Sequence, residues 1–395
     1  MSDGLRTPRL LVAFGGLSYV LFPIPIVTLY WKDQIGLSLT EIMLLQAIFG
    51  TASVLLEFPS GYVADRVGYR TSLVIGMTVW AVGWVFYATG DTFAGVAVAE
   101  ILLGAGHAFV SGADAALLFS SLNAAGRIGE YRRWEGRVRA AGQACEAASS
   151  AVGGWLYSVA PRLPIWLELP VALAGLGIAL RMDDGRARAA VTTGHAARMW
   201  HVTRYALTHA RLRTAMLLSV VLGQSTFVMV WLIQPWMQRR GIPVAWFGPL
   251  WAAAHVWLAL VSLASARIAD ALGARTVLVV CALLAVTGYA TLGVFDAAWA
   301  VVFYLCFMTT RGLQGPILTT VIQADAPADD RASVLSLNAL GFRLAFVACG
   351  PAIGALVDRI GLEPALELLA IVFAVALAVS LAIFTRAHPS AGSEH

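Results

Sequence analysis

Three ionisable residues lie at intervals of seven within one long apolar stretch of the sequence, residues 93–121. They are Glu100, His107 and Asp114. Because an α-helix has about 3.6 residues per turn, this spacing predicts that all three share one helix face, with steps of about 10.5 Å. A charged group in hydrocarbon costs about 2.5–3.5 kcal/mol, so such residues face protein or water. Their types predict proton transfer that is assisted by water or by helix motion.

The next apolar stretch, 134–158, carries a second polar stripe that includes Glu146. The basic residues Arg311 and Arg343 lie instead in stretches of the second half, 297–321 and 332–357. Two interpretations follow: static ion pairs that lock helices together, or a desolvated carboxyl that carries a coupled proton and is tuned by an arginine. For the second, we expect Asp114 and Glu146 to be the main proton carriers. Glu100 lies near the outer end, where partial solvation is expected, and His107 could equally be a hydrogen-bonded helix contact.

The composition requires a lipid environment for most of the chain. Of its 395 residues, 59% are hydrophobic and 13% are charged, whereas soluble domains carry about 25% charged residues. A spanning helix needs about 20 apolar residues, and backbone groups in lipid must be satisfied within helices or a closed barrel. The long continuous runs favour helices, so we expect an all-α integral membrane protein with twelve spans. The predicted spans are 9–31, 39–63, 71–90, 93–121, 134–158, 164–182, 213–237, 245–268, 275–295, 297–321, 332–357 and 363–386.

The longest polar interruption, from Arg181 to Arg213, divides these spans into two groups of six. We therefore expect an N-terminal six-helix bundle (1–182), a cytoplasmic linker (183–212) that is basic and amphipathic, and a C-terminal bundle (213–395). With the N-terminus inside, 20 basic residues lie on the cytoplasmic side and five lie outside, as the positive-inside rule requires. The prediction is a multi-pass protein of the plasma (inner) membrane with both termini cytoplasmic. Its basic residues contact lipid headgroups rather than nucleic acid.

A charge cluster recurs in the two halves of the sequence. The segment GYVADRVGYR covers residues 61–70, and a shorter version, ADALGAR, covers residues 269–275. Asp65 and Arg70 thus reappear as Asp270 and Arg275 at an offset of 205 residues. A second pair, EILLG at 100–104 and RGLQG at 311–315, has an offset of 211 residues. Markers in the same order at nearly constant offset indicate duplication of a six-helix unit.

These motifs resemble those of the major facilitator superfamily, and the resemblance covers almost the whole chain. The family motif between its second and third spans, G-x-L-A-D-R-x-G-R-K/R, is matched by Gly61, Ala64, Asp65, Arg66, Gly68 and Arg70. RGLQG resembles the R-x-x-Q-G motif, which the family normally carries in its fourth span, where Glu100 stands here. The resemblance implies two pseudo-symmetric six-helix bundles around a mid-membrane binding site. The fifth-span antiporter motif lacks its proline, so the resemblance to drug/proton antiporters is weaker.

The resemblance also implies that the charge cluster is a gate, which latches the cytoplasmic ends of the two halves in the outward-open state. Its members would be Gly61, Asp65, Arg66, Gly68 and Arg70, with Asp270 and Arg275 as a partial copy. We expect Gly61 to allow a close helix approach, and Asp65 to accept backbone N–H groups at the start of the third span. Arg66 and Arg70 would pair with nearby acids at about 0–1 kcal/mol each, which suits a latch that breaks in every cycle. The alternative is an ordinary solvated loop.

For the substrate, the resemblance places the first, fourth, seventh and tenth spans around the cavity. The candidate binding residues on these spans are Tyr19, Phe22, Gln224, Phe227, Trp231 and Gln314. Aromatic rings with a few amides suit an amphipathic or aromatic organic molecule. Aromatic residues also anchor helices at membrane interfaces, so this alternative stays open.

Several classes of function lack their residues in this sequence. The single lysine, Lys32, follows no phosphate-binding loop, so the chain is not expected to hydrolyse ATP. No catalytic or metal-ligand motif is found, and we expect neither an enzyme nor a cofactor or metal. The prediction is a monomeric secondary active transporter that exports a small organic molecule by alternating access and is driven by protons. The alternatives are a proton-coupled uptake symporter for a metabolite, a non-transporting membrane sensor, or a membrane-embedded enzyme.

Overall fold

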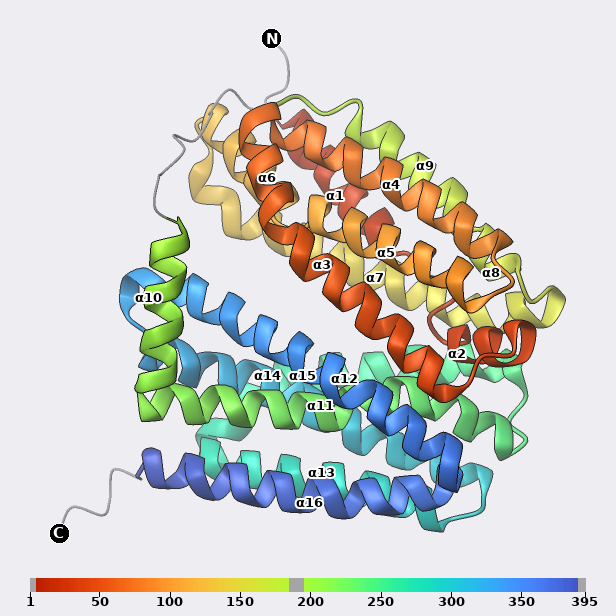
Figure 1. Cartoon of the computed structure of the whole chain (residues 1–395). Helices are drawn as coiled ribbons and strands as arrows, with labels where there is room; N and C mark the ends of the chain where they lie inside the picture. Colours follow the sequence, from red (N-terminus) through yellow and green to blue (C-terminus); the bar gives the residue numbers. More distant parts are fainter. Residues whose placement is uncertain (1–4, 185–194, 390–395) are drawn as a thin grey trace. The chain divides into compact units, whose positions relative to one another are not determined.

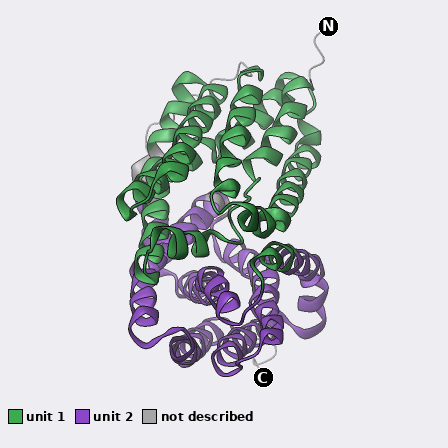
Figure 2. Ribbon diagram, turned by 90° about the vertical axis from the view of Figure 1, so that its right-hand side faces the viewer, with its two compact units in different colours: residues 1–191, 243–252 green, residues 192–242, 253–395 purple. Residues whose placement is uncertain are grey.

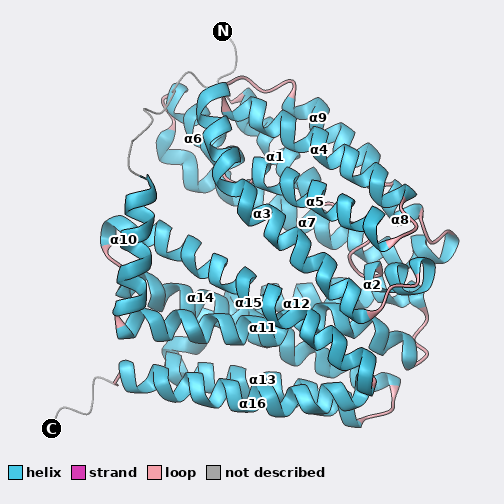
Figure 3. Cartoon of the chain, in the orientation of Figure 1, coloured by secondary structure: helices cyan, strands magenta, loops and turns pink. Residues whose placement is uncertain are grey.

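The computed structural model describes residues 5–184 and 195–389, and every regular element in these residues is a helix (Figures 1 and 3). The expectation of an all-α protein is therefore confirmed for the described part of the chain. Eight helices there are long and apolar enough to cross a membrane. All twelve predicted stretches coincide with a helix or with consecutive helical segments. The count of twelve spans stays a prediction, because some of these segments are too short or too polar by the same measure.

The chain forms two compact units, which Figure 2 distinguishes by colour. Unit 1 comprises residues 1–191 together with 243–252. Its helical elements are α1 (Arg6–Ser18), α2 (Val27–Leu29), η1 (Tyr30–Ile35), α3 (Leu39–Val67), α4 (Tyr69–Thr89), α5 (Phe93–Val110), α6 (Ala113–Ala124), η2 (Ile128–Glu130), α7 (Tyr131–Val159), α8 (Leu163–Trp166), α9 (Glu168–Ala179) and η3 (Val244–Trp246).

Unit 2 comprises residues 192–242 together with 253–395. Its helical elements are α10 (His195–Thr208), α11 (Ala210–Arg239), most of α12 (Phe247–Leu272), α13 (Ala274–Val294), η4 (Ala298–Phe303), α14 (Tyr304–Asp325), η5 (Ala328–Asp330), α15 (Arg331–Ile360) and α16 (Leu362–Ala387). The predicted linker therefore contains a helix, α10, whereas its residues 185–194 lie outside the described part.

One pair of corresponding helices has the same length, and turns near it recur in both halves. Helices α4 and α13 are both 21 residues long, and their bounds differ by the predicted offset of 205. The glycine before each of them has a positive φ, 104° at Gly68 and 80° at Gly273. A further pair with positive φ, Gly36 and Gly241, shows the same offset. Side chains rarely adopt this backbone conformation, so the repeated glycines mark the same turns in both copies.

Two predicted spans are interrupted near their middle. The stretch 9–31 loses regular helix between Ser18 and Val27, a segment that contains Pro23 and Pro25. The stretch 93–121 is broken at Ser111 and at Gly112, whose φ of 84° is positive. Because Pro removes a backbone donor and a positive φ ends an α-helix, these breaks free backbone groups inside an apolar region.

The core of unit 1 forms where α1, α4, α6 and α7 meet. It is centred on Leu11 and Phe14 of α1, Met77 of α4, Leu117 of α6 and Trp134 of α7. Helices α4 and α5 approach each other closely, and α4 also packs against α9 (Figure 1). The α4–α5 approach depends on facing glycines, because a Cβ on Gly106 would lie 2.9 Å from the carbonyl oxygen of Gly76. This core positions the interrupted helices that carry the buried carboxyls of unit 1.

Candidate functional site

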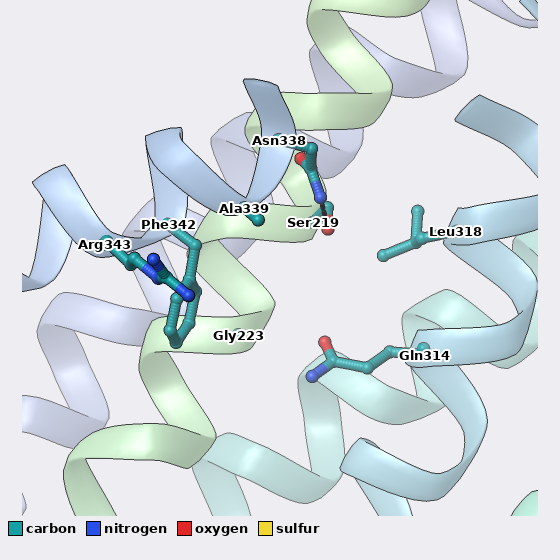
Figure 4. Close-up of a pocket in the computed structure, with 9 residues that line it drawn as sticks. Ser219, Gly223, Gln314, Leu318, Asn338, Ala339, Phe342 and Arg343 are labelled. Atoms are coloured by element: carbon teal, nitrogen blue, oxygen red, sulfur yellow. Dashed lines mark hydrogen bonds between the residues drawn. The ribbon is translucent and has the colours of Figure 1, made fainter. Parts of the chain in front are cut away.

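A cavity of about 300 Å³ lies within unit 2, between α11, α14 and α15 (Figure 4). Nine residues line it: Ser219, Gly223, Gln314, Gly315, Leu318, Asn338, Ala339, Phe342 and Arg343. Two of the residues singled out from the sequence, Gln314 and Arg343, thus share one cavity. Gly315 belongs to the RGLQG motif, and none of the other residues on the wall was predicted as a site residue.

Two side-chain oxygens at this cavity have no hydrogen-bond donor among the described residues. Gln314 is only 8% exposed, and its Oε1 has no partner. Its amide points from α14 into the open space shown in Figure 4. Asn338 donates from Nδ2 to Ser219 Oγ at 3.2 Å, but its Oδ1 has no donor either. Because an unsatisfied buried polar atom costs about 1–3 kcal/mol, a ligand or water that donates to these oxygens would be stabilised here.

The other three candidate substrate residues of unit 2 are Gln224, Phe227 and Trp231. They do not line the cavity but contact Phe342 of its wall, directly or through Phe227. Gln224 Nε2 donates to the backbone oxygen of Phe342 at 2.7 Å, so its amide helps to hold α15 against α11. The ring of Phe227 packs edge to face on Phe342 at 5.4 Å between centroids, and on Trp231 at 6.0 Å. An added Cβ on Gly223 would lie 2.9 Å from the Phe342 ring. These residues therefore fix the position of Phe342 on the cavity wall.

Arg311 lies one helical turn before Gly315, on the same side of α14. It interacts electrostatically with Tyr304, and no described carboxylate forms an ion pair with it. A static ion pair at Arg311, which was one of the two interpretations of the intramembrane charges, is therefore not present in the described part of the chain.

The break in the first predicted span of unit 1 is satisfied by side chains from two other helices. The freed backbone N–H of Leu21 donates to Ser149 Oγ of α7 at 3.0 Å, and that of Phe22 donates to Glu168 Oε1 of α9 at 2.7 Å. Glu168 is 2% exposed and has no basic partner among the described residues. Glu168 was not predicted as a site residue, although a lone acid within the apolar stretch 164–182 is a recognisable signal. Of the two substrate candidates here, Phe22 lies in this break, and Tyr19 caps the end of α1.

Glu100 of α5 is buried rather than partly solvated, so that expectation is wrong. It is 4% exposed, accepts a hydrogen bond from Tyr87 Oη at 3.2 Å, and interacts with the side chain of Gln46. Tyr87 in turn packs against Trp31 at 6.1 Å between ring centroids. Two aromatic rings thus shield the carboxyl within its own unit.

The predicted stripe along the fourth span is only partly regular. Glu100 and His107 both belong to α5, but the break at Gly112 separates them from Asp114 in the first turn of α6. The seven-residue period therefore cannot be extended to Asp114. Asp114 Oδ1 accepts the backbone N–H of Ala115 at 2.7 Å, and its carboxyl interacts electrostatically with Arg139.

Glu146 and His107 lie on α7 and α5 of unit 1. Glu146 is half-buried on α7, and Gln143 Nε2 donates to it at 3.4 Å. The ring of His107 lies 6.1 Å from that of Phe49 on α3, in a tilted arrangement. In the described residues, no group of three or more His, Cys, Asp or Glu side chains is arranged to hold a metal ion.

The charge cluster after α3 contacts the end of α9. The backbone N–H of Arg70 donates to Asp184 Oδ1 at 2.8 Å, and its Nη2 donates to the carbonyl oxygen of Leu180 at 2.6 Å. Arg70 thus caps the carbonyls of one helix while Asp184 caps the first turn of α4. A Cβ on Gly68 would collide with Asp184, so this position requires glycine.

The capping role expected for Asp65 is therefore wrong, because Asp184 takes that place. Asp65 is exposed, and Arg66 lies over the ring of Tyr62 at 4.7 Å instead of pairing with an acid. An added Cβ on Gly61 would meet nothing within 4 Å, so the expected close helix approach is absent here. In the second copy, Asp270 and Arg275 are both exposed.

A sequence model described as the Major Facilitator Superfamily matches residues 10–348. The Inner membrane transport protein YajR of Escherichia coli (strain K12) is 30% identical over 114 residues. That match covers 27% of this chain and 25% of YajR, so the chain matches about a quarter of that relative.

Solved structures match over nearly the full chain. The nucleoside transporter NupG aligns with a TM-score of 0.76 at 14% identity, over 97% of this chain and 99% of NupG. The D-xylose-proton symporter aligns with a TM-score of 0.72 at 13% identity, over 94% of this chain and 96% of that one. At these identities the likeness is one of fold.

Proposed function

The chain belongs to the Major Facilitator Superfamily, and we propose from this premise that it is a secondary active transporter of a small organic molecule. It works by alternating access and is coupled to protons in the direction of export. The observation that carries this proposal is the cavity of unit 2, where two unsatisfied amide oxygens and a guanidinium face the same space. Such convergence of a few polar groups on a largely apolar wall is typical of ligand sites.

The proton is carried by carboxyls of unit 1. Asp114 and Glu146 are its main carriers, and Glu100 with His107 belongs to the same set. Glu168 joins them on structural grounds, since it is a buried acid that accepts a hydrogen bond from a backbone amide and has no basic partner in the described part of the chain. Acids in a membrane-spanning region are costly, and they mark proton relays when no base neutralises them.

Arg311 and Arg343 belong to the groups that act on the substrate, and not to the groups that carry the proton. The cavity lies within unit 2 and the proposed proton carriers belong to unit 1, so substrate and proton are bound by separate groups. Exchange at separate groups supports antiport, whereas uptake by symport would pair an acid with a substrate-binding base. The proposal of export rests on this separation, and uptake by symport is its alternative.

The transporter is placed in the plasma (inner) membrane as a monomer with both termini cytoplasmic. Its bundles are residues 1–182 and 213–395, and the helix α10 belongs to the connecting segment 183–212. The excess of arginine in the segments assigned to the cytoplasm supports this orientation.

The coupling is tested by flux measurements in proteoliposomes, with a ligand found by a thermal-shift screen against metabolites and drugs. An imposed pH gradient is expected to drive substrate uphill. The double variant Asp114→Asn with Glu146→Gln is expected to lose at least about 90% of this driven flux, because neither position then carries a proton. Substrate flux that changes neither with the gradient nor in the double variant would refute proton coupling. The sign of the gradient that drives the flux decides between export and uptake.

The gate is assigned to the loop between α3 and α4, because among the described residues this copy has an acidic partner, Asp184, that accepts the backbone N–H of Arg70. Asp65→Asn is expected to change the ratio of inward- to outward-open molecules by about two- to fivefold, as an exposed interaction of up to about 1 kcal/mol would. Distance measurements between spin labels on the two halves report this ratio. Asp270→Asn, the same change in the second copy, is the matched control and is expected to have no effect. Equal responses of the two variants would contradict a gate confined to the first loop.

A further inference from the structure

Two buried hydrogen-bond acceptors at the cavity of unit 2 lack a donor. Gln314 Oε1 belongs to α14 and Asn338 Oδ1 to α15, and neither accepts a hydrogen bond from the described part of the chain. In Figure 4 the amide of Gln314 lies at the lower end of the open space, and Asn338 lies at its upper end. The terminal torsion of an amide side chain is soft, so a small rotation presents each oxygen to a ligand. The cavity therefore offers one acceptor at each of two ends.

An apolar side chain accompanies each of these amides on the cavity wall. Leu318 lies one helical turn after Gln314 on α14, and Phe342 lies one turn after Asn338 on α15, so each hydrophobic side chain shares a helix face with an amide. Gly315 adds open space, because a Cβ at this position would meet no atom within 4 Å. The volume of about 300 Å³ lies at the lower end of the range for ligand pockets. The lining thus suits a small ligand with polar ends and an apolar middle.

We propose that this cavity binds a small molecule that has an apolar middle and a hydrogen-bond donor, O–H or N–H, at each of its two ends. The proposal rests on the transport function proposed above and adds its substrate class. One end of the ligand donates to Gln314 Oε1 and the other end donates to Asn338 Oδ1, while its middle packs on Leu318 and Phe342. A site of this kind discriminates against molecules without the donors, because its buried oxygens then stay unsatisfied.

The test uses probes built on one ring, with binding measured by calorimetry on the purified full-length protein in nanodiscs. They are para-benzenedimethanol, which has two donors, its monomethyl ether, which has one, and its dimethyl ether, which has none. Methylation removes the donor and keeps the oxygen as an acceptor, so the series isolates the O–H groups. Affinity is expected to fall at least about fivefold for each donor lost. The proposal is overturned if the diol does not bind, or if either ether binds as tightly as the diol.

Two variants assign the donors to the cavity. Gln314→Leu removes one acceptor, so the affinities of the diol and the monomethyl ether are expected to agree within about twofold, while the dimethyl ether stays weaker. Asn338→Leu is expected to give the same pattern, because the monomethyl ether can turn round and present its single donor to Gln314. Gln323→Leu removes an amide of α14 that does not line the cavity, so this matched control should keep both steps of the series. Steps that persist in both cavity variants would come from the size of the added methyl groups and would overturn the proposal.

The stability of the ligand-free protein provides a second measurement. Gln314 is only 8% exposed, and leucine at this position replaces a buried oxygen that has no donor in the described part of the chain. Gln314→Leu is therefore expected to unfold at the same temperature as the wild type or at a higher one. A lower unfolding temperature would show that the fold itself needs this amide, and would overturn its assignment to a ligand.

Transport of the same probes, measured against protein-free liposomes, separates this proposal from the one on which it rests. Protein-dependent flux of the dimethyl ether but not of the diol would leave the transporter standing and overturn its substrate class. Donor-dependent binding of the diol without protein-dependent flux in either direction would support the binding class and overturn the transporter.

Discussion

Replacing Gly315 by tryptophan is expected to abolish transport without unfolding the protein. Gly315 belongs to α14 and lines the cavity of unit 2, and an added Cβ there would meet no atom within 4 Å. A large side chain can therefore extend into the cavity without displacing a neighbour. We expect substrate flux to fall at least about 100-fold, which corresponds to about 2.8 kcal/mol of lost binding.

A graded series makes this expectation specific for the cavity. Flux should fall from alanine through leucine to tryptophan at position 315, as the side chain fills more of the space. Thermal stability should not fall with it, because replacing glycine within a helix by alanine stabilises the helix by about 0.5–1 kcal/mol. Gly177 of α9 also has open space around its Cβ position but lies in unit 1, away from this cavity. Gly177→Trp is therefore the matched control, and equal flux in the two tryptophan variants would contradict a substrate role for the cavity.

Local signals in the sequence were sufficient to predict the helices of this protein. The apolar stretches correspond to helical segments because each is long enough to bury its own backbone groups in lipid. The offset of 205 residues between Asp65 and Asp270 predicted the repeat, and the paired glycines Gly68 and Gly273 have matching positive φ values. The helices depend on residues that are close in the chain, and the repeat is found by comparing the sequence with itself, so one sequence suffices to find both.

The partners of the functional residues could not be predicted in the same way. Arg70 and Asp184 are 114 residues apart, and Phe22 and Glu168 are 146 residues apart. Which acid caps which amide depends on how α9 packs against α1 and α4, and no spacing rule carries that information. The predicted stripe of the fourth span failed for a local reason, because Gly112 adopts a positive φ and ends α5 before Asp114.

Replacing Glu168 by glutamine is expected to uncouple transport from protons. The glutamine keeps an oxygen that can accept the N–H of Phe22, so the interrupted first span stays satisfied. It cannot bind and release a proton, however, so a pH gradient can no longer drive substrate uphill. Exchange of labelled for unlabelled substrate needs no net proton movement, and its rate should stay within about twofold of the wild-type rate.

The comparison of driven flux with exchange separates a proton carrier from a structural cap. Ser149→Ala removes the hydroxyl that accepts the N–H of Leu21 at the same break, but it removes no titratable group. Since it leaves a buried backbone donor unsatisfied at a cost of about 1–3 kcal/mol, it should lower thermal stability and reduce driven flux and exchange together. Glu168→Gln should instead reduce driven flux alone by at least about tenfold, because only the proton-binding step is lost. If Glu168→Gln reduces both rates in parallel, as Ser149→Ala does, Glu168 is a cap for the broken helix and the coupled proton is carried by other carboxyls.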